Sequence, residues 1–233
     1  MSGMLTALSE GLPRLGLELD ETRQRQLCAF GEAVIRQNEV MNLTAITEPT
    51  QVAKLHLLDS LSLLTLADLK GKRIIDVGCG AGFPGVPVKI ACPEAKLTLL
   101  DSLGKRMNWL EQILPQLGVE AECLTARAEE AVQTRREKYD IATSRAVARL
   151  NILLELTAPY VKPGGLVLAM KGTAAREELS EAKNAISRLG LKLEKVVEFP
   201  IDDTAHAVIV LRKVTHTPPQ YPRRYAKIKQ SPL

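Results

Sequence analysis

The chain has 233 residues, of which 45% are hydrophobic, 25% charged and 3% aromatic, and its formal net charge is +4 at pH 7. This composition is typical of a soluble globular protein and excludes collagen-like, coiled-coil and disordered chains. No apolar run reaches the ~18 residues that a membrane-spanning helix needs, and the N-terminus lacks the basic start and apolar stretch of a secretory signal.

The cysteines indicate a reducing compartment. Cys28, Cys79, Cys92 and Cys123 are far apart in the chain, and no two of them have CxxC spacing. Only three histidines are present, so no zinc-binding pattern can be assembled. We therefore expect a cytoplasmic protein with free cysteines, no metal and no membrane anchor.

Residues 1–70 are predicted to be helical. Apolar residues recur at helical spacing from Asp20 to Asn38, which predicts one amphipathic helix. The sequence around Pro49 predicts the start of a second helix. On that helix His56 and Asp59 lie three residues apart and share a face, so they could frame a substrate cleft, although an ordinary surface pair is the commoner explanation.

From residue 72 onward, β-rich runs alternate with helical stretches. This alternation predicts a doubly wound, mostly parallel sheet of seven strands with right-handed crossovers. The last two strands have no helix between them, so they should pair antiparallel through a turn at residues 200–205. The predicted strands are 73–77, 96–100, 122–125, 139–143, 165–170, 192–199 and 207–212, and the predicted helices are 84–91, 105–117, 128–138, 150–160 and 174–189.

These patterns divide the chain into a helical extension (1–70), a Rossmann-like α/β domain (71–213) and a basic tail (214–233). Three prolines predict that the tail is extended. Its cations could bind phosphates, and from charge alone a solvated terminus is the simpler interpretation. The cations in question are Arg223, Arg224, Lys227 and Lys229.

A glycine-rich turn follows the first predicted strand and precedes a helix. Gly78, Gly80 and Gly82 permit a sharp turn and let a ligand lie directly on the backbone. Asp101 follows Gly82 by 19 residues and ends the next strand. A carboxylate there can accept both hydroxyls of an adenosine ribose. The turn and Asp101 together predict a nucleotide-type cofactor.

Asp76 distinguishes between two cofactor classes. It lies two residues before Gly78, where a carboxylate would repel the anionic pyrophosphate of NAD or FAD. S-adenosylmethionine carries an ammonium and a sulfonium group, which a carboxylate attracts. The pattern therefore favours S-adenosylmethionine, although the glycines alone also fit a dinucleotide.

The fourth predicted strand is informative for what it lacks. The segment 139–148 contains neither an Asn/Asp-Pro-Pro-Tyr element, which grips an exocyclic amine, nor a Pro-Cys nucleophile. These absences permit, without specifying, methyl transfer to an atom that is already nucleophilic, such as guanine N7. Such a transfer needs alignment and no general base. Arg145 is a candidate for cofactor or RNA contact, and a surface arginine at a helix start is an equal alternative.

At this point the chain resembles the family of bacterial ribosomal RNA small subunit methyltransferase G, also called glucose-inhibited division protein B. The resemblance extends over nearly the whole chain, and the combination of its blocks is specific although the glycine motif alone is widespread. The blocks are Asn38-Glu-Val-Met-Asn-Leu-Thr-Ala, His56-Leu-Leu-Asp-Ser-Leu, Asp76-Val-Gly-Cys-Gly-Ala-Gly-Phe-Pro-Gly, Ser144-Arg-Ala and Tyr221-Pro-Arg-Arg.

The resemblance implies a class I S-adenosylmethionine-dependent methyltransferase that modifies guanine N7 in a loop of 16S RNA. It supplies no general base, with Arg145 as possible catalytic support, and we expect RNA contacts by His56 and the basic tail. After Tyr225 the tail departs from the family pattern but keeps its charge. The implied cofactor residues are Gly78, Phe83, Ala128, Glu129 and Arg145, which join Asp76, Gly80 and Asp101.

The sequence therefore predicts a methyltransferase acting on 16S RNA or on an assembly intermediate of the 30S subunit, as a monomer. One alternative is a methyltransferase of the same fold that acts on a small molecule or a protein. Two others are an NAD-dependent oxidoreductase and a protein that binds a nucleotide without chemistry.

Overall fold

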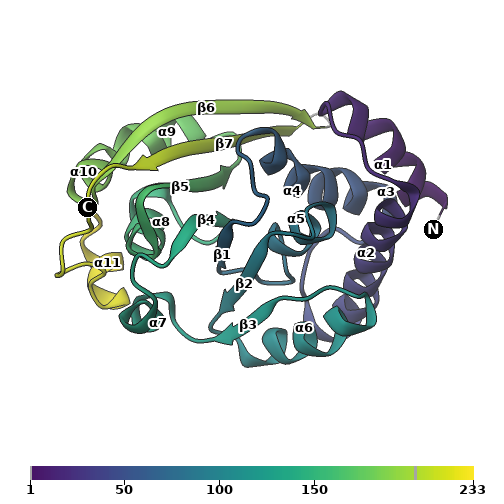
Figure 1. Cartoon of the computed structure of the whole chain (residues 1–233), viewed down its shortest axis with the longest axis horizontal. Helices are drawn as coiled ribbons and strands as arrows, with labels where there is room; N and C mark the ends of the chain where they lie inside the picture. The colour runs from purple at the N-terminus through teal and green to yellow at the C-terminus, as the bar shows by residue number, and fades with distance from the viewer. Residues whose placement is uncertain (1, 202–203) are drawn as a thin grey trace.

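The computed structural model describes residues 2–201 and 204–233 and contains one seven-stranded sheet with helices on both faces (Figure 1). Asp202 and Asp203, in the predicted turn between the last two strands, lie outside the described residues. The strands are β1 (Arg73–Val77), β2 (Lys96–Asp101), β3 (Glu122–Thr125), β4 (Tyr139–Arg145), β5 (Val161–Lys171), β6 (Leu191–Ile201) and β7 (Thr204–Lys213).

The strand order is β3-β2-β1-β4-β5-β7-β6. Strands β1 to β5 are parallel, while β7 pairs antiparallel with both β5 and β6. This confirms the predicted doubly wound sheet and the predicted antiparallel pairing of the last two strands. The order reverses direction between β1 and β4, and a ligand crevice forms at such a point, beyond the carboxyl ends of the strands.

The helices follow the prediction with differences at their ends. The predicted helix 174–189 is two helices, because Ala182 leaves helical geometry (φ −83°, ψ 4°). The predicted helix 128–138 ends at Arg135, and Glu137 takes a left-handed φ of 52°. The helices after the first strand are α5 (Gly85–Ala91), α6 (Gly104–Gln116), α7 (Ala128–Arg135), α8 (Leu150–Thr157) with the 3₁₀ turn η3 (Ala158–Tyr160), α9 (Ala175–Glu181), α10 (Lys183–Arg188) and α11 (Tyr225–Gln230).

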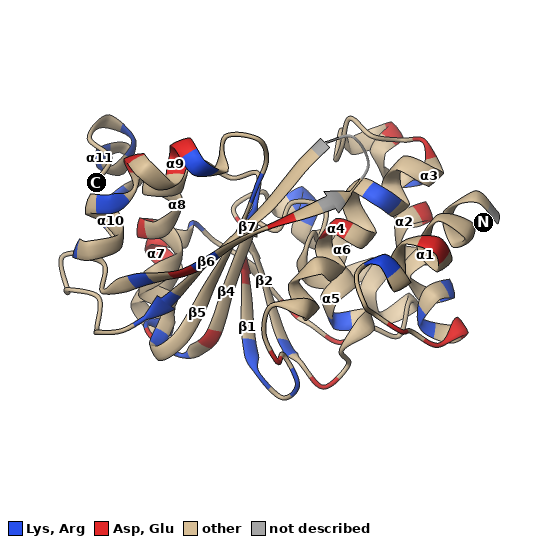
Figure 2. Cartoon of the chain, turned by 90° about the horizontal axis from the view of Figure 1, so that it is seen from above, with Lys and Arg blue, Asp and Glu red and all other residues tan. Residues whose placement is uncertain are grey.

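The first 70 residues form a helical layer on one side of the sheet (Figure 2). Before the predicted helix at Asp20 there is a further helix, whose residues Met4 and Leu8 are fully buried. No helix among the described residues is long and apolar enough to cross a membrane. The elements are α1 (Ser2–Arg14), α2 (Glu21–Met41), α3 (Pro49–Val52), the π-helix η1 (Ala53–Leu58), α4 (Asp59–Leu61) and the 3₁₀ helix η2 (Ser62–Thr65).

Alternation of side chains along the strands builds two cores. Ile74 points to one face of the sheet and packs with the N-terminal helices, α5 and α6. Ile75 points to the other face and packs with α7, α8 and α10. Because Leu8 of α1 and Leu99 of β2 belong to the same core, the helical extension shares the covering of this face with α5 and α6.

The prediction that the tail is extended is wrong at its end, where residues 225–230 form α11. Ile228 is fully buried and anchors this helix, and α11 packs against α8. Burial of Ile228 supplies packing energy that a six-residue helix lacks in isolation. Figure 1 shows α11 at the end of the molecule opposite α1.

Candidate functional site

The glycine-rich loop after β1 takes the left-handed conformation at three positions: φ is 72° at Gly78, 57° at Gly80 and 96° at Gly82. The backbone N–H of Gly78 donates to the carbonyl of Leu100 at 2.7 Å, which ties the loop to the end of β2. A Cβ at Gly78 would lie 2.4 Å from a methyl group of Val147. Both the turn and the close approach therefore require glycine at this position.

Asp76 lies beneath this loop and is fully buried. Its Oδ2 accepts the backbone N–H of Gly85 at 2.8 Å, while its Oδ1 has no hydrogen-bond partner among the described residues. Burial raises the pKa of Asp76 to about 7, against the opposing hydrogen bond from Gly85. Asp76 thus holds the glycine-rich loop to the start of α5. It does not line the adjoining cavity beyond the strand ends, so its direct contact with a cofactor stays a prediction.

Asp101 occupies the predicted place at the carboxyl end of β2. Its Oδ2 accepts the N–H of Gly80 at 3.0 Å and its Oδ1 accepts the N–H of Leu103 at 2.9 Å. Ala128 and Glu129 begin α7 close by, since the N–H of Ala126 donates to the carbonyl of Asp101. The ends of β2 and β3 thus bring together Asp101, Ala128 and Glu129. None of the three lines the adjoining cavity.

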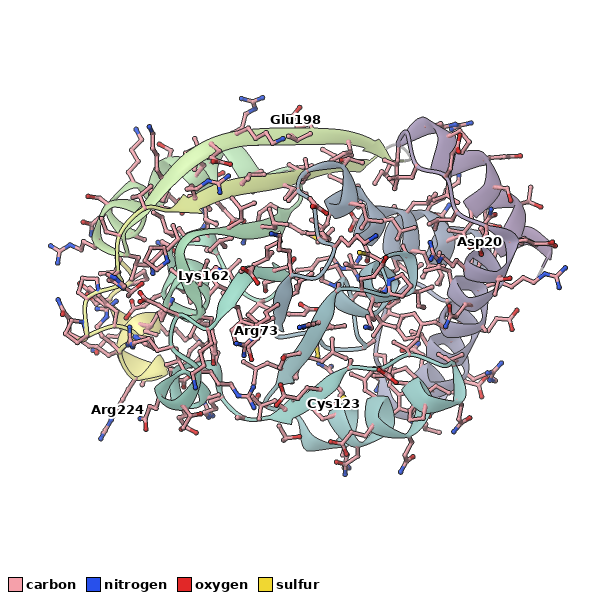
Figure 3. The ribbon with its side chains drawn as sticks, in the orientation of Figure 1. Asp20, Arg73, Cys123, Lys162, Glu198 and Arg224 are labelled. Atoms are coloured by element: carbon pink, nitrogen blue, oxygen red, sulfur yellow. The ribbon has the colours of Figure 1, made fainter. Side chains whose placement is uncertain are left out.

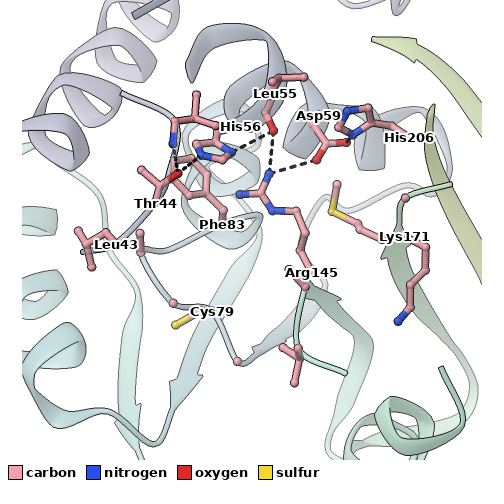
Figure 4. A pocket seen from close by; sticks show the side chains of 18 of the residues that line it. Leu43, Thr44, Leu55, His56, Asp59, Cys79, Phe83, Arg145, Lys171 and His206 are labelled. Carbon is pink, nitrogen blue, oxygen red and sulfur yellow. Dashed lines mark hydrogen bonds and ion pairs between the residues drawn. The ribbon is translucent and has the colours of Figure 1, made fainter. Parts of the chain in front are cut away.

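A cavity of about 900 Å³ opens beyond the carboxyl ends of β1, β4 and β5 (Figure 4). This volume is within the range of small-molecule and cofactor sites. Of the residues predicted from sequence, the cavity wall contains Gly78, Gly80, Phe83, Arg145 and His56. The walls come from the glycine loop, from strand ends and from the N-terminal helices, so the helical extension is part of the site.

Arg145, the last residue of β4, is the centre of the polar network in this cavity. Its guanidinium donates to the carbonyl of Leu55 at 3.0 Å and to Asp59 Oδ2 at 3.1 Å. Asp59 Oδ1 lies 3.0 Å from Nδ1 of His206. The same guanidinium lies over the ring of Phe83, 5.0 Å from its centroid. Three distant segments therefore fix the orientation of one arginine (Figure 4).

The ring of His56 packs against the ring of Phe83, with the two centroids 4.9 Å apart. Burial lowers the pKa of His56 to about 4, and the nearby Arg145 cation acts in the same direction. Nδ1 lies 3.0 Å from the carbonyl of Leu55, which can only accept, so Nδ1 carries the proton. Nε2 then accepts from the hydroxyl of Thr44 at 2.7 Å. The ring is neutral at pH 7 and both nitrogens are engaged.

Several residues of the wall were not predicted as site residues. Lys171 ends β5 and pairs with Glu178 at 2.7 Å, and His206 comes from β7. Lys171 could have been found from its place at the carboxyl end of a parallel strand, and Thr44 from the Asn-Leu-Thr-Ala block. His206 carries no such signal, because its strand runs in the opposite direction.

The tail cations lie away from this cavity, and one of them is occupied within the fold. The guanidinium of Arg223 donates to both oxygens of Glu155, at 2.8 and 2.6 Å, and Glu155 is fully buried. The guanidinium of Arg223 would have to leave Glu155 before it could make the predicted contact with RNA. Arg224, Lys227 and Lys229 are exposed, and Arg224 points away from the body of the molecule (Figure 3).

Comparison with known sequences agrees with this architecture. The sequence model of the family described as rRNA small subunit methyltransferase G matches residues 23–206. The ribosomal RNA small subunit methyltransferase G of Caldanaerobacter subterraneus subsp. tengcongensis is 44% identical in an alignment that covers 97% of each chain. The protein of the same name from Alkaliphilus metalliredigens is 43% identical in an alignment that also covers 97% of each chain.

Comparison with solved structures shows the fold. M. jannaschii TYW2 in complex with AdoMet matches with a TM-score of 0.55 at 11% identity, over 67% of this chain and 75% of that one. Precorrin-6y C5,15-methyltransferase from Geobacter metallireducens matches with a TM-score of 0.52 at 13% identity, over 75% and 91%. The sheet is thus that of the class I S-adenosylmethionine-dependent methyltransferases. With the sequence matches, this shows that the chain belongs to the rRNA small subunit methyltransferase G family.

Proposed function

We propose that this protein transfers the methyl group of S-adenosylmethionine to N7 of a guanosine in 16S ribosomal RNA. The fold and the family support the cofactor and the ribosomal RNA substrate class. The observation that favours N7 is that His56 and the two acids of the described cavity wall are already engaged within the fold. The neutral ring of His56 uses both nitrogens, and Asp59 and Glu178 are each paired with a cation.

Guanine N7 suits such a site because its lone pair lies in the plane of the ring and no proton has to leave. In the transfer, the N7 lone pair attacks the methyl carbon and the carbon–sulfur electron pair returns to sulfur. The positive charge moves from the sulfonium to the purine. Alignment of the two reactants can supply ~7–11 kcal/mol of the barrier, so a rigid cavity suffices without acid–base catalysis.

The roles of the site residues follow from their places. Gly78, Gly80, Phe83 and Arg145 would contact the methionine end of the cofactor in the cavity. Asp101 would accept the ribose hydroxyls in place of one of its backbone donors, with Ala128 and Glu129 beside the adenine, and Asp76 would act through the loop that it holds.

The RNA would enter from the side of the N-terminal helices. His56 would present its stacked ring to the target base, because neutral aromatic faces hold unpaired bases by stacking. Arg224, Lys227 and Lys229 would contact phosphates farther along the RNA. A monomer acting in the cytoplasm on naked RNA or on a 30S assembly intermediate fits this arrangement.

The direct test is incubation of the purified protein with labelled S-adenosylmethionine and either 16S RNA or 30S particles, followed by nucleoside digestion and mass spectrometry. We expect the label in N7-methylguanosine at one position. Label on another base, or none on RNA, would refute the proposal. Turnover of a small molecule or protein that is insensitive to salt would favour the alternative substrates.

A second test asks whether His56 acts as a general base. The variant Thr44→Val removes the donor to Nε2 of His56 and leaves that nitrogen without a partner. If His56 acts only by stacking, the pH dependence of methylation should not change. A new dependence on a group with a pKa near that of histidine would show proton transfer at this residue.

A further inference from the structure

The described part of the cavity wall contains three cationic side chains and two acidic ones, besides two histidines and the thiol of Cys79. Arg145 pairs with Asp59, and Lys171 pairs with Glu178. Arg106 is the third cation. The wall is therefore one charge positive when His56 and His206 are neutral, although it belongs to a methyltransferase whose methyl donor carries a cationic sulfur.

The pair Arg145–Asp59 lies at the place in this wall where an unpaired cation would stand beside the glycine loop. The Asp59 side chain is 6% exposed and that of Arg145 is 17% exposed, so water screens the guanidinium poorly. Arg145 stands at the carboxyl end of β4, beside the glycine loop, because the loop residue Gly78 abuts Val147 two residues beyond Arg145. An unpaired guanidinium at this place would repel a sulfonium cation in the same cavity.

From this geometry we infer that Asp59 is the positioning and charge-compensating residue that lets the cavity accept the cationic methyl donor. Asp59 Oδ2 neutralises Arg145, while Oδ1 is held at Nδ1 of His206. The carboxylate is thereby kept on the guanidinium, which stays over Phe83. Asp59 does not need to touch either substrate to act in this way.

This inference rests on the proposal that S-adenosylmethionine binds in the cavity, and it makes a separate prediction about selectivity. S-adenosylmethionine and the product S-adenosylhomocysteine have the same amino-acid and adenosine groups, and they differ in the methyl group and the positive charge at sulfur. Loss of the Asp59 charge should therefore weaken binding of the methyl donor more than binding of the product. A change that only loosened the fold would weaken both alike.

The experiment measures the dissociation constants of both compounds by calorimetry for the wild type and for Asp59→Asn. We expect the ratio of the constant for S-adenosylmethionine to that for S-adenosylhomocysteine to rise about tenfold in the variant, the size of a typical coupling between sites. The conservative variant Asp59→Glu keeps the charge and should keep the ratio near that of the wild type. In Asp59→Asn combined with Arg145→Gln, the repelling cation is also absent, so the ratio should return toward the wild-type value.

The matched control is Asp140→Asn. Asp140 is also an ion-paired carboxylate, 2.5 Å from Lys162, but it lies at the opposite end of β4, so its loss should leave the ratio unchanged. An unchanged ratio in a folded Asp59→Asn protein, or a rise that persists in the double variant, would overturn the inference while leaving the proposed function intact. Failure of the wild type to bind either compound would instead refute the cofactor site itself. If Asp59→Asn does not fold, Asp59→Ser removes the same charge with a smaller side chain, and the same rise in the ratio is expected.

Discussion

Asp76 holds the glycine-rich loop through a hydrogen bond, but burial of its carboxylate makes the stability of the fold depend on pH. Its Oδ2 holds the N–H of Gly85, its Oδ1 is unpartnered in the described structure, and burial raises its pKa from 3.8 to about 7. A raised pKa means that the folded protein holds this proton more tightly than the unfolded chain does. As the pH rises from about 4 to about 7, the unfolded chain releases the proton first, and the folded state loses stability relative to it.

The variant Asp76→Asn should remove this dependence, because the amide oxygen can still accept from Gly85 and carries no titrating proton. Without cofactor, the unfolding free energy of the wild type should fall relative to the variant by up to about 1.4 kcal/mol per pH unit between pH 4 and 7, and then level off. Urea unfolding at a series of pH values measures the difference. Parallel curves for the two proteins would show that folding does not raise the pKa of Asp76.

Gly78 allows a sharper test of the loop, because Gly71 provides a matched control. Both take φ near +70°, but a Cβ at Gly71 would meet nothing within 4 Å, whereas at Gly78 it would meet Val147. Each alanine variant should lose about 1–2 kcal/mol of stability from the left-handed backbone. Only Gly78→Ala should also lose S-adenosylmethionine binding by calorimetry, since it pushes Val147 within the cavity wall. Equal affinity in both variants would contradict the assigned role of the loop.

At the scale of elements, the tail that ends in α11 has one cation that anchors it to the fold and three exposed cations that we predict to bind RNA. Arg223 makes its bonds to buried Glu155, so Arg223→Ala should cost about 3 kcal/mol by leaving that carboxylate unpaired. The triple alanine variant of Arg224, Lys227 and Lys229 should leave the unfolding midpoint unchanged, since all three are exposed. It should instead flatten the salt dependence of RNA affinity, by about 0.7 in the logarithmic slope for each phosphate that the variant no longer binds. An unchanged slope in filter-binding assays would show that the tail does not bind RNA.

At the scale of the whole molecule, the N-terminal helices and the sheet share one core. Leu8, Phe30 and Leu57 pack in the same cluster as Leu99 and Leu168. A chain reduced to residues 71–233 would keep α5 and α6 but expose the part of this face that the N-terminal helices cover. We therefore expect it to aggregate or remain unfolded, judged by circular dichroism and gel filtration against the full chain. A folded, monomeric fragment would show instead that the predicted boundary at residue 70 separates two independent units. Whether the boundaries mark true domains stays a prediction until then.

The sequence alone determined the features that arise from local patterns. The spacing of apolar residues predicted the strands and helices and their order along the chain, because each spacing shows which side of a segment is buried. The glycine loop and the acid at the end of β2 were predictable because a left-handed turn and a strand end leave marks in consecutive residues. His56 and Asp59 could be placed on one helix face, but not relative to β4 or β7.

Only the tertiary structure decided which distant side chains meet. Arg145 and Asp59 are 86 residues apart, and Arg223 and Glu155 are 68 apart. Their pairing depends on how the N-terminal helices and the tail pack against the sheet, which no local period encodes. The same holds for Asp76, whose charge suggested a cofactor contact: packing under the loop, rather than its place in the motif, put its carboxylate below the cavity wall. Periodicity specifies the surface that each element buries, whereas packing specifies the partner, and the site consists of such partners.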